Sequence, residues 1–303
     1  MRNKPVFFAS AAACCALLAS CGGGDSATPT PTPTSTGTPT PTPPTTIDFD
    51  FTKAFTATAS GTSFNYAYFA PTGGYEVWSE GSRRGGEAKI TFAVSPESVT
   101  LEWPDPSTLT TFSAADLLTA SPTLRTYRKG SDGLSMELPF DNVLRVAYET
   151  TIPYTRETVA GNLHGYRYSI FYNTVTTTTA IASNLAYTGT AQVVGGKSGE
   201  TPPGVFSSPA TTLTVTSSDK KIAGTIQVVE SVAGAPVVRA ALPISSTLTD
   251  SGVFAGDTED TANAFKGKYV GSLAGPDREE VFLIFEVQHT DGRKFLGSLI
   301  GKR

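Results

Sequence analysis

Apolar and polar residues alternate in short runs through the C-terminal part of the chain. Along residues 279–288, every second residue from Val281 to Val287 is apolar and would share one face of a strand, whereas Glu286 and Gln288 would point the opposite way. Similar runs, rich in Val, Thr and aromatic residues, are separated by turn residues such as Gly, Pro and Asp. We therefore predict eight strands, over residues 185–194, 210–216, 221–229, 237–244, 251–254, 265–273, 279–288 and 294–300.

Glycines lie inside four of these strands, at positions 189, 224, 271 and 297. A glycine within a strand often marks a sharp bend in a closing sheet. We place Gly195-Gly196 and Gly256-Asp257, by contrast, in turns between strands. Eight antiparallel strands with such bends predict a closed eight-stranded antiparallel β-barrel that is filled with its own side chains, and a β-sandwich is the alternative.

A barrel in the outer membrane would need strands of ~9–11 residues with apolar sides that face lipid. Several of the predicted strands are shorter, and their polar faces carry Lys, Glu, Gln and Thr. The pattern therefore favours a barrel that is surrounded by water.

The preceding part of the chain, residues 47–185, is also rich in β-forming residues but less regular. Its alternation predicts strands over residues 64–69, 74–78, 88–93, 99–103, 142–149 and 165–172, with one plausible helical turn over residues 113–118. Arg83 and Arg84 lie between glycines, which is typical of an exposed turn. We expect a handle-like β domain, whose longer polar connections are the places where binding residues usually lie.

One predicted strand of this part has an aromatic face. Its alternate residues would form two faces, one with Tyr166, Tyr168, Ile170 and Tyr172 and the other with Arg167, Ser169 and Phe171. Tyrosine phenolates can ligate ferric iron, and aromatic rings can stack on haem or on sugars. A half-buried strand whose tyrosine hydroxyls reach water has the same pattern, so both interpretations stay open.

The first residues have the pattern of a bacterial lipoprotein signal peptide. Arg2 and Lys4 precede an apolar run over residues 6–18 that is too short for a transmembrane helix. Leu18-Ala19-Ser20 then precedes Cys21, as at the cleavage site of such signals. We expect cleavage of residues 1–20 and acylation of Cys21, for example with palmitate, with an ordinary secretory signal as the alternative. Gly22 after the cysteine favours the outer membrane.

A Thr-Pro segment follows the cysteine. Nearly every residue from 28 to 46 is Thr or Pro, so this segment cannot bury a core and favours extended polyproline II. At ~3.1 Å per residue, residues 21–46 could hold the folded part several nanometres from the membrane. We interpret residues 21–46 as a lipid-anchored spacer.

Composition and motifs exclude several classes of function. The formal net charge is −4, and loss of Arg2 and Lys4 with the signal peptide would make it −6, so this mildly acidic chain argues against a nucleic-acid partner. All three cysteines lie at or before position 21, which leaves the mature chain without a disulfide or a thiolate metal site. No nucleophile elbow, paired-histidine metal motif, P-loop or dinucleotide fingerprint is present in the sequence.

Few candidate catalytic residues remain. His164 falls in a loop-like segment, and His289 precedes Asp291-Gly292 in a predicted hairpin turn. Glu279 and Glu280 are neighbours on a strand, so their side chains would diverge and could not form an acid–base pair. One of them would contact solvent and the other would accept a hydrogen bond at a turn or strand end. We predict no enzyme activity, no cofactor and no metal site.

A resemblance covers about residues 186–303. Residues 265–281, Phe-Lys-Gly-Lys-Tyr-Val-Gly-Ser-Leu-Ala-Gly-Pro-Asp-Arg-Glu-Glu-Val, resemble the last barrel strands of the transferrin-binding protein B family. Gly275-Pro276 and Glu280-Val281 keep the spacing of that family's Phe-Tyr-Gly-Pro and Glu-Val-Gly-Gly, and the final Lys302-Arg303 is similar to its terminal basic pair. Leu273-Ala274 and Phe282-Leu283 depart from the family's Phe-Tyr and paired glycines, as expected of a distant member.

The resemblance extends upstream and implies a function. Residues 64–66 and 166–186 resemble transferrin-binding-protein-like solute-binding lipoproteins, which pair an N-terminal handle domain with a C-terminal barrel. It implies a handle domain over residues 47–185, a barrel domain over residues 186–303, and a non-enzymatic lipoprotein on the outer-membrane surface. Such a protein would capture an iron- or haem-bearing ligand, or another solute, for a TonB-dependent receptor. A structural or adhesive surface protein is the alternative, and no binding residue is transferred by the resemblance.

Overall fold

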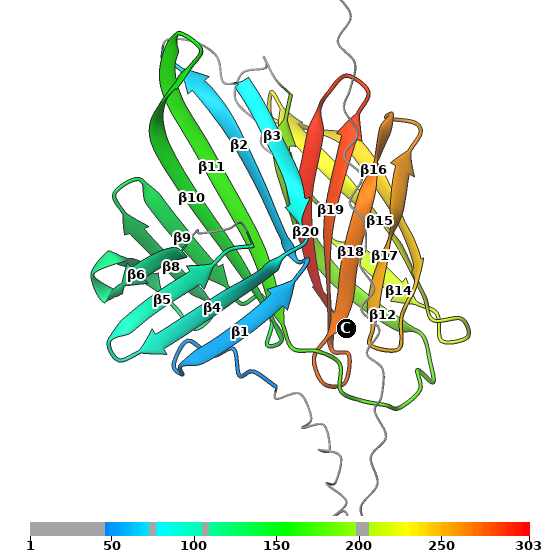
Figure 1. Cartoon of the computed structure of the whole chain (residues 1–303). Helices are drawn as coiled ribbons and strands as arrows, with labels where there is room; N and C mark the ends of the chain where they lie inside the picture. The colour runs from blue at the N-terminus through cyan, green and yellow to red at the C-terminus, as the bar shows by residue number, and fades with distance from the viewer. Residues whose placement is uncertain (1–45, 73–76, 105–108, 198–205) are drawn as a thin grey trace, which may run out of the picture. The chain divides into compact units, whose positions relative to one another are not determined.

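The computed structural model describes residues 46–72, 77–104, 109–197 and 206–303 (Figure 1). Cys21, the predicted signal peptide and the predicted spacer up to residue 45 lie outside these residues. Every regular element in the described part is a β-strand except one 3₁₀ turn, Ala114–Asp116, which lies within the predicted helical turn. The all-β prediction is therefore confirmed. Within the same residues, no helix has the length and apolar character that a membrane span requires.

Two antiparallel sheets form the first part of the described chain. The four-stranded sheet has the order β1-β4-β5-β6, with β1 (Phe55–Ser60), β4 (Glu87–Val94), β5 (Glu97–Glu102) and β6 (Leu109–Ser113). The seven-stranded sheet has the order β3-β2-β11-β10-β9-β8-β7, with β2 (Ser63–Pro71), β3 (Val77–Arg84), β7 (Leu117–Ala120), β8 (Leu124–Lys129), β9 (Asp132–Glu137), β10 (Val143–Arg156) and β11 (Val159–Tyr172). Both sheets contribute to one core, which includes Phe92, Leu101, Phe112, Met136 and Phe171.

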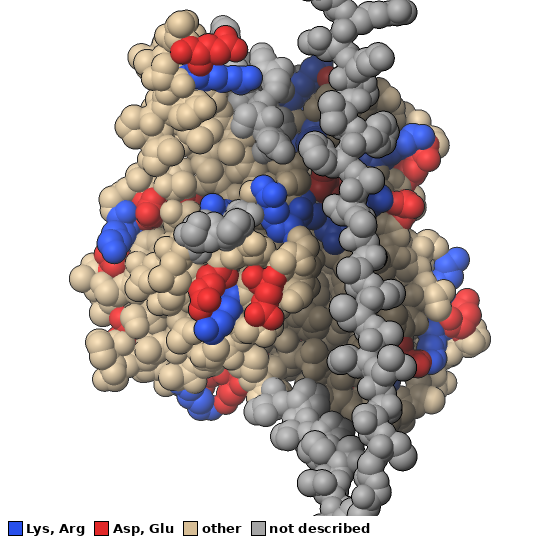
Figure 2. All heavy atoms as spheres, viewed as in Figure 1, with Lys and Arg blue, Asp and Glu red and all other residues tan. Residues whose placement is uncertain are grey.

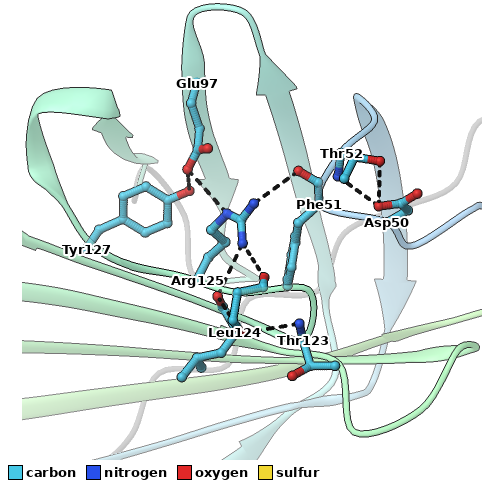
Figure 3. Close-up of polar contacts among 9 residues, drawn as sticks. Asp50, Phe51, Thr52, Glu97, Thr123, Leu124, Arg125 and Tyr127 are labelled. Atoms are coloured by element: carbon cyan, nitrogen blue, oxygen red, sulfur yellow. Dashed lines mark hydrogen bonds and ion pairs between the residues drawn. The ribbon is translucent and has the colours of Figure 1, made fainter.

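Arg125 of β8 holds the segment that leads into β1. Its guanidinium donates a hydrogen bond to the carbonyl of Phe51 at 3.3 Å, and its Nε lies 3.6 Å from the carboxylate of Glu97 (Figure 3). Tyr127 donates to the same carboxylate at 2.7 Å. Because Arg125 is only 9% exposed, water screens these contacts weakly. The network fixes the place where the chain enters the folded part after the predicted spacer.

The nine-stranded antiparallel sheet contains all eight strands that the C-terminal alternation predicts, together with a short additional strand, β13. Its strands are β12 (Leu185–Gly196), β13 (Phe206–Ser207), β14 (Thr211–Val215), β15 (Lys221–Val232), β16 (Ala235–Thr247), β17 (Val253–Asp260), β18 (Phe265–Ala274), β19 (Glu280–His289) and β20 (Lys294–Lys302). The order is β13-β15-β14-β12-β20-β19-β18-β17, with β16 paired to β15. Its concave face encloses a core of apolar side chains, as predicted.

Two pairs of residues that were predicted as turns lie in strands. Gly195-Gly196 ends β12, and Gly256-Asp257 lies in the middle of β17. A Cβ atom at position 256 would lie 2.6 Å from the hydroxyl of Tyr269. Gly256 therefore allows close packing within the sheet and does not form a turn. Because Gly256-Asp257 was predicted as a turn, the strand predicted over residues 251–254 is too short.

Backbone pairing does not close the nine-stranded sheet into the predicted barrel. Strands β16 and β17, both fully described, are neighbours without a backbone ladder between them. Pro243 of β16 has no N–H to donate, and its carbonyl accepts a hydrogen bond from the hydroxyl of Thr258 at 2.9 Å. The N–H of Ala241 is taken by the carboxylate of Asp260 at 2.6 Å. Side chains thus bridge the place where a ladder would have closed the barrel.

Strand β19 is buried on both faces, although the sequence predicts one partly polar face. Leu283 and Phe285 point into the core of the nine-stranded sheet. Phe282 and Ile284 belong to a second core, which the nine-stranded sheet shares with the seven-stranded sheet. From the seven-stranded sheet, this shared core receives Phe64, Tyr66, Tyr68, Val143 and Ile170.

Candidate ligand-binding site

Aromatic side chains of β2 and β11 stack in pairs on one face of the seven-stranded sheet. We call these pairs the aromatic ladder: Phe64–Tyr168, Tyr66–Tyr166 and Tyr68–His164. In that order, the ring centroids are 4.6, 4.4 and 4.6 Å apart, with 11°, 4° and 19° between the ring planes. The members of each pair are direct neighbours across two antiparallel strands, where cross-strand contacts are closest. The ladder therefore forms a rigid row of parallel rings.

The predicted division of β11 into two faces is confirmed. Tyr166, Tyr168 and Tyr172 point toward the shared core, whereas Phe171 points into the core between the first two sheets. The ring centroid of Tyr172 lies 4.5 Å from that of Phe282 in β19. This end of the aromatic face is covered by the nine-stranded sheet, so Tyr172 is a packing residue.

Tyr66 and Tyr168 of the ladder are neutral hydrogen-bonding groups. Burial raises the pKa of Tyr66 and of Tyr168 well above the ordinary value for tyrosine, and the neighbouring tyrosines raise that of Tyr66 further. Ferric iron is bound by phenolates, so this environment disfavours the iron-ligand interpretation. In the described part of the chain, no group of three or more His, Cys, Asp or Glu side chains could hold a metal ion.

A slot of about 360 Å³ opens beside the ladder, where β8, β9 and β10 extend the sheet beyond β11. We call it the aromatic slot, and its lining includes Leu118, Thr126, Ser135, Ala147, Tyr166 and Tyr168. Strand register aligns Thr126, Ser135 and Ala147 in one row next to Tyr168. The volume falls within the range of small-molecule sites, and the lining combines aromatic rings with hydroxyl groups.

An ion pair forms one end of the slot. Arg128 Nη2 donates to Glu149 Oε1 at 2.6 Å, and both side chains are a little less than half exposed. Strand register places Gly133 between them, and a Cβ atom there would lie 2.9 Å from Glu149 Oε1. The missing side chain of Gly133 lets the pair lie flat against the sheet. The slot therefore offers donors and acceptors side by side without a net charge.

The structure does not bring the two histidines together. His164 lies inside β11 rather than in a loop, stacks on Tyr68 and shares a 3.0 Å hydrogen bond with Thr151. His289 ends β19 and contacts Asp291 at 2.6 Å within the predicted hairpin turn. The loop prediction for His164 fails because the β10–β11 hairpin continues through the glycines on either side of it.

The other candidate residues have structural surroundings. Arg83 and Arg84 are half-buried at the end of β3 rather than in an exposed turn, and the N–H of Arg83 donates to Glu286 at 2.9 Å. Glu279 accepts a hydrogen bond in its turn from the N–H of Asp277 at 3.0 Å. Glu280 is fully buried, so the two carboxylates diverge as predicted.

The residues of the slot were missed by the sequence analysis, apart from the tyrosines. Thr126, Arg128 and Ser135 lie on β8 and β9, two short strands that were not predicted. Their alternation of polar and apolar residues over 124–137 was the only available signal. On the face drawn in Figure 2, acidic and basic side chains lie mostly beside one another.

Comparisons with known proteins give structural likenesses only. No protein-family model and no curated protein matches the chain. A transferrin binding protein B variant from Haemophilus parasuis Hp5 is 12% identical with a TM-score of 0.43, covering 80% of this chain and 59% of that one. The isotype 1 protein of the same name from serogroup B Neisseria meningitidis is 14% identical with a TM-score of 0.44, covering 79% and 43%. A structure described as a surface lipoprotein is 9% identical with a TM-score of 0.40, covering 80% and 99%.

The chain spans less than two thirds of the length of either transferrin binding protein, at 59% and 43%. At identities of 9–14% and TM-scores of 0.40–0.44, these likenesses transfer neither a family nor a ligand. The resemblance of residues 265–281 to that family therefore stays a prediction.

Proposed function

We propose that the chain is a non-enzymatic lipoprotein of the outer-membrane surface that binds a ligand outside the cell. The observation that carries the proposal is the aromatic slot, which presents Tyr166 and Tyr168 beside the Arg128–Glu149 pair. Acylation of Cys21 and the spacer over residues 21–46 would hold this slot away from the membrane. In this proposal, residues 47–185 form the handle-like domain that binds the ligand, and residues 186–303 form the supporting domain.

Delivery to a TonB-dependent receptor is the proposed purpose of binding. The support is the resemblance of residues 265–281 and 64–66 to transferrin-binding lipoproteins, which capture iron- or haem-bearing ligands. The proposed partners are thus the outer membrane, a TonB-dependent receptor and an iron- or haem-bearing ligand or another solute, with no nucleic acid.

Co-purification from iron-starved cells tests this function. The full mature chain, carrying an affinity tag at its C-terminus, is isolated in mild detergent from cells grown with and without iron. We expect expression to rise on iron limitation and a TonB-dependent receptor or an iron-bearing ligand to co-purify. Expression that is indifferent to iron, together with the absence of both partners, would overturn uptake.

Adhesion is a second candidate function, which a different observation favours. The β10–β11 hairpin carries apolar side chains near its end that remain in solvent: Ile152 and Tyr154 are each 45% exposed, and Val159 is 49% exposed. Exposed apolar side chains gathered on one element are typical of a contact surface. Adhesion predicts that Ile152→Ser combined with Tyr154→Ser reduces attachment of cells to a surface without changing iron uptake.

A further inference from the structure

Small side chains leave the floor of the aromatic slot open. Directly paired residues of neighbouring antiparallel strands project from the same face, so Ala147, Ser135 and Thr126 form one row beside Tyr168. At ~4.8 Å between strands, the row from β10 to β8 is roughly 10 Å across. A single six-membered ring with its substituents fits on such a floor.

One wall of the slot is made of aromatic ring faces. Tyr168 stacks on Phe64 with one face of its ring, at 4.6 Å and 11°, so its other face is directed toward β10. There its neighbour is Ala147, whose methyl group is too short to cover the ring. Tyr166 likewise stacks one face of its ring on Tyr66, and its neighbour in β10 is Glu149. These ring faces offer flat apolar surface to the C–H groups of a ligand.

The end of the slot supplies paired polar groups. The Arg128 guanidinium has five N–H donors, of which one bonds to Glu149 at 2.6 Å and another to the carbonyl of Ser131 at 3.4 Å. The adjacent guanidinium and carboxylate match a hydroxyl group, which donates and accepts at once. Because the two charges compensate each other, the pair attracts neither anions nor cations strongly.

We propose that the aromatic slot binds an uncharged saccharide, with one sugar ring stacked on Tyr168 and its hydroxyl groups bonded to Arg128 and Glu149. A sugar ring has apolar C–H faces and a rim of hydroxyls, which corresponds to the wall and the end of the slot. A planar aromatic compound would use the ring wall but not the ion pair. This inference rests on the proposed ligand-binding function and specifies the chemical class of the ligand.

Calorimetry with defined saccharides tests the inference. The full mature chain in detergent is titrated with neutral di- to tetrasaccharides of glucose, galactose, mannose, xylose and N-acetylglucosamine, with trigalacturonic acid as an acidic probe and quinoline as an aromatic probe. We expect at least one neutral saccharide to bind and to exceed both other probes in affinity at least tenfold. Binding of quinoline alone, of the acid alone, or of none of the probes overturns the proposal.

Variants locate the binding in the slot. Thr126→Leu fills the floor from β8, and Glu149→Gln removes the charged acceptor, so each should weaken saccharide binding at least tenfold. Thr56→Leu is the matched control, because Thr56 is exposed on β1 in a different sheet. Equal affinities for the Thr126 and Thr56 variants would place the binding elsewhere and overturn the proposal.

Two further arms identify the source of the saccharide and separate this test from that of the proposed function. Polysaccharide purified from the surface of the producing cells and polysaccharide from the growth medium are each added as competitors. Displacement by only one of them identifies the source. Saccharide binding without receptor capture would overturn receptor delivery alone, whereas receptor capture without saccharide binding would overturn the saccharide alone.

Discussion

Asn142 holds the buried carboxylate of Glu280 with both its backbone and its side chain. The backbone N–H of Asn142 donates to Glu280 Oε1 at 3.0 Å, and its Nδ2 donates to the same oxygen at 3.1 Å. The N–H of Asp141 adds a third bond at 3.0 Å. Since Asn142 immediately precedes β10 and Glu280 begins β19, these bonds join the seven-stranded sheet to the nine-stranded sheet.

Because the carboxyl group of Glu280 is buried, we predict that the protein loses stability as the pH rises. Burial raises the pKa of Glu280 above its ordinary value of 4.5, although the three hydrogen bonds act in the opposite direction. A carboxyl group with a higher pKa in the folded state holds its proton more tightly there than in the unfolded state. Its stabilising contribution is therefore complete below pH 4.5 and is lost as the pH rises through the folded-state value.

Urea unfolding of Glu280→Gln checks this prediction between about pH 4.5 and pH 7.5. We expect the free energy of unfolding of the variant, relative to the unmodified protein, to increase with pH over this window. Glu279→Gln is the matched control, because the Glu279 side chain is partly exposed and its carboxylate accepts a hydrogen bond from Asp277 in its own turn. Identical pH dependence in the Glu280 and Glu279 variants would contradict the argument.

Asp260 is predicted to stabilise the junction of β16 and β17. Burial alone would raise the pKa of its carboxyl group, but hydrogen bonds from Ala241 and Asn263 outweigh burial and lower the pKa. Its contribution is thus present above the ordinary value of 3.8 and is lost as the pH falls through the lowered value. Asp260→Ala leaves the N–H of Ala241 without its acceptor, which should cost about 1–3 kcal/mol at neutral pH.

Thermal and urea unfolding at pH 7 measure this cost. Asp257→Ala, at an exposed position of the same strand, is the control and should change stability by less than about 0.5 kcal/mol. A cost for Asp260→Ala as small as that of the control would show that this side chain does not hold the junction.

We predict that position 297 requires glycine, because the ring of Phe285 leaves no room for a side chain there. A Cβ atom at position 297 would lie 2.5 Å from Phe285 Cζ and 2.8 Å from the carbonyl oxygen of Gln192. Since the carbonyl belongs to the backbone of β12, relief would require the sheet to shift, and Gly297→Ala should cost about 1–3 kcal/mol. Gly85→Ala is the control, with open space around its Cβ position. Equal melting temperatures of the two variants would contradict this role.

The nine-stranded sheet could be predicted strand by strand because its turns carry clear residue signals. Gly234 and Gly292, for instance, adopt φ values of 81° and 91° in hairpin turns. Figure 1 shows the long β10–β11 hairpin, for which the predicted strands were too short. Pro153 and Gly161 lie within it, and both are residue types that often interrupt strands. In the structure Gly161 lies so close to the backbone of Ala70 in β2 that a side chain there would collide.

The aromatic face of the site was predictable, but the slot was not. Alternation places Tyr166 and Tyr168 on one face without knowledge of any other strand. Their stacking partners on β2 lie about a hundred residues away in sequence, and no local pattern specifies that pairing. Closure of the predicted barrel failed for a similar reason, since the contacts of Pro243 and Asp260 across β16 and β17 depend on tertiary structure.

Cys21 is predicted to be the membrane anchor. In Cys21→Ser the thiol that would receive the acyl chain is absent, so the precursor should stay unprocessed or the mature chain should be released from outer membranes. Membrane fractionation with immunodetection measures both outcomes, and Ser20→Ala, which leaves the cysteine in place, is the control. Fractionation of Cys21→Ser that is indistinguishable from the unmodified protein would exclude the anchor.

Residues 186–303 are predicted to fold without residues 47–185, because the nine-stranded sheet has its own core of fully buried side chains such as Leu213, Ile226 and Leu283. The isolated fragment should give β-type circular dichroism and a cooperative melt. It would also expose Phe282 and Ile284, which the seven-stranded sheet covers in the whole chain. We therefore expect the fragment to be less stable than the whole chain and prone to self-association.

Sedimentation and melting of two variants of this fragment separate self-association from loss of stability. Ile284→Thr should reduce the self-association of the fragment, because it removes apolar surface only from the face that the seven-stranded sheet covers. Leu283→Thr, one residue away but facing the inner core, should instead lower the melting temperature through the loss of buried contacts. A fragment that gives no cooperative melt would place the domain boundary elsewhere and make the two sheets one folding unit.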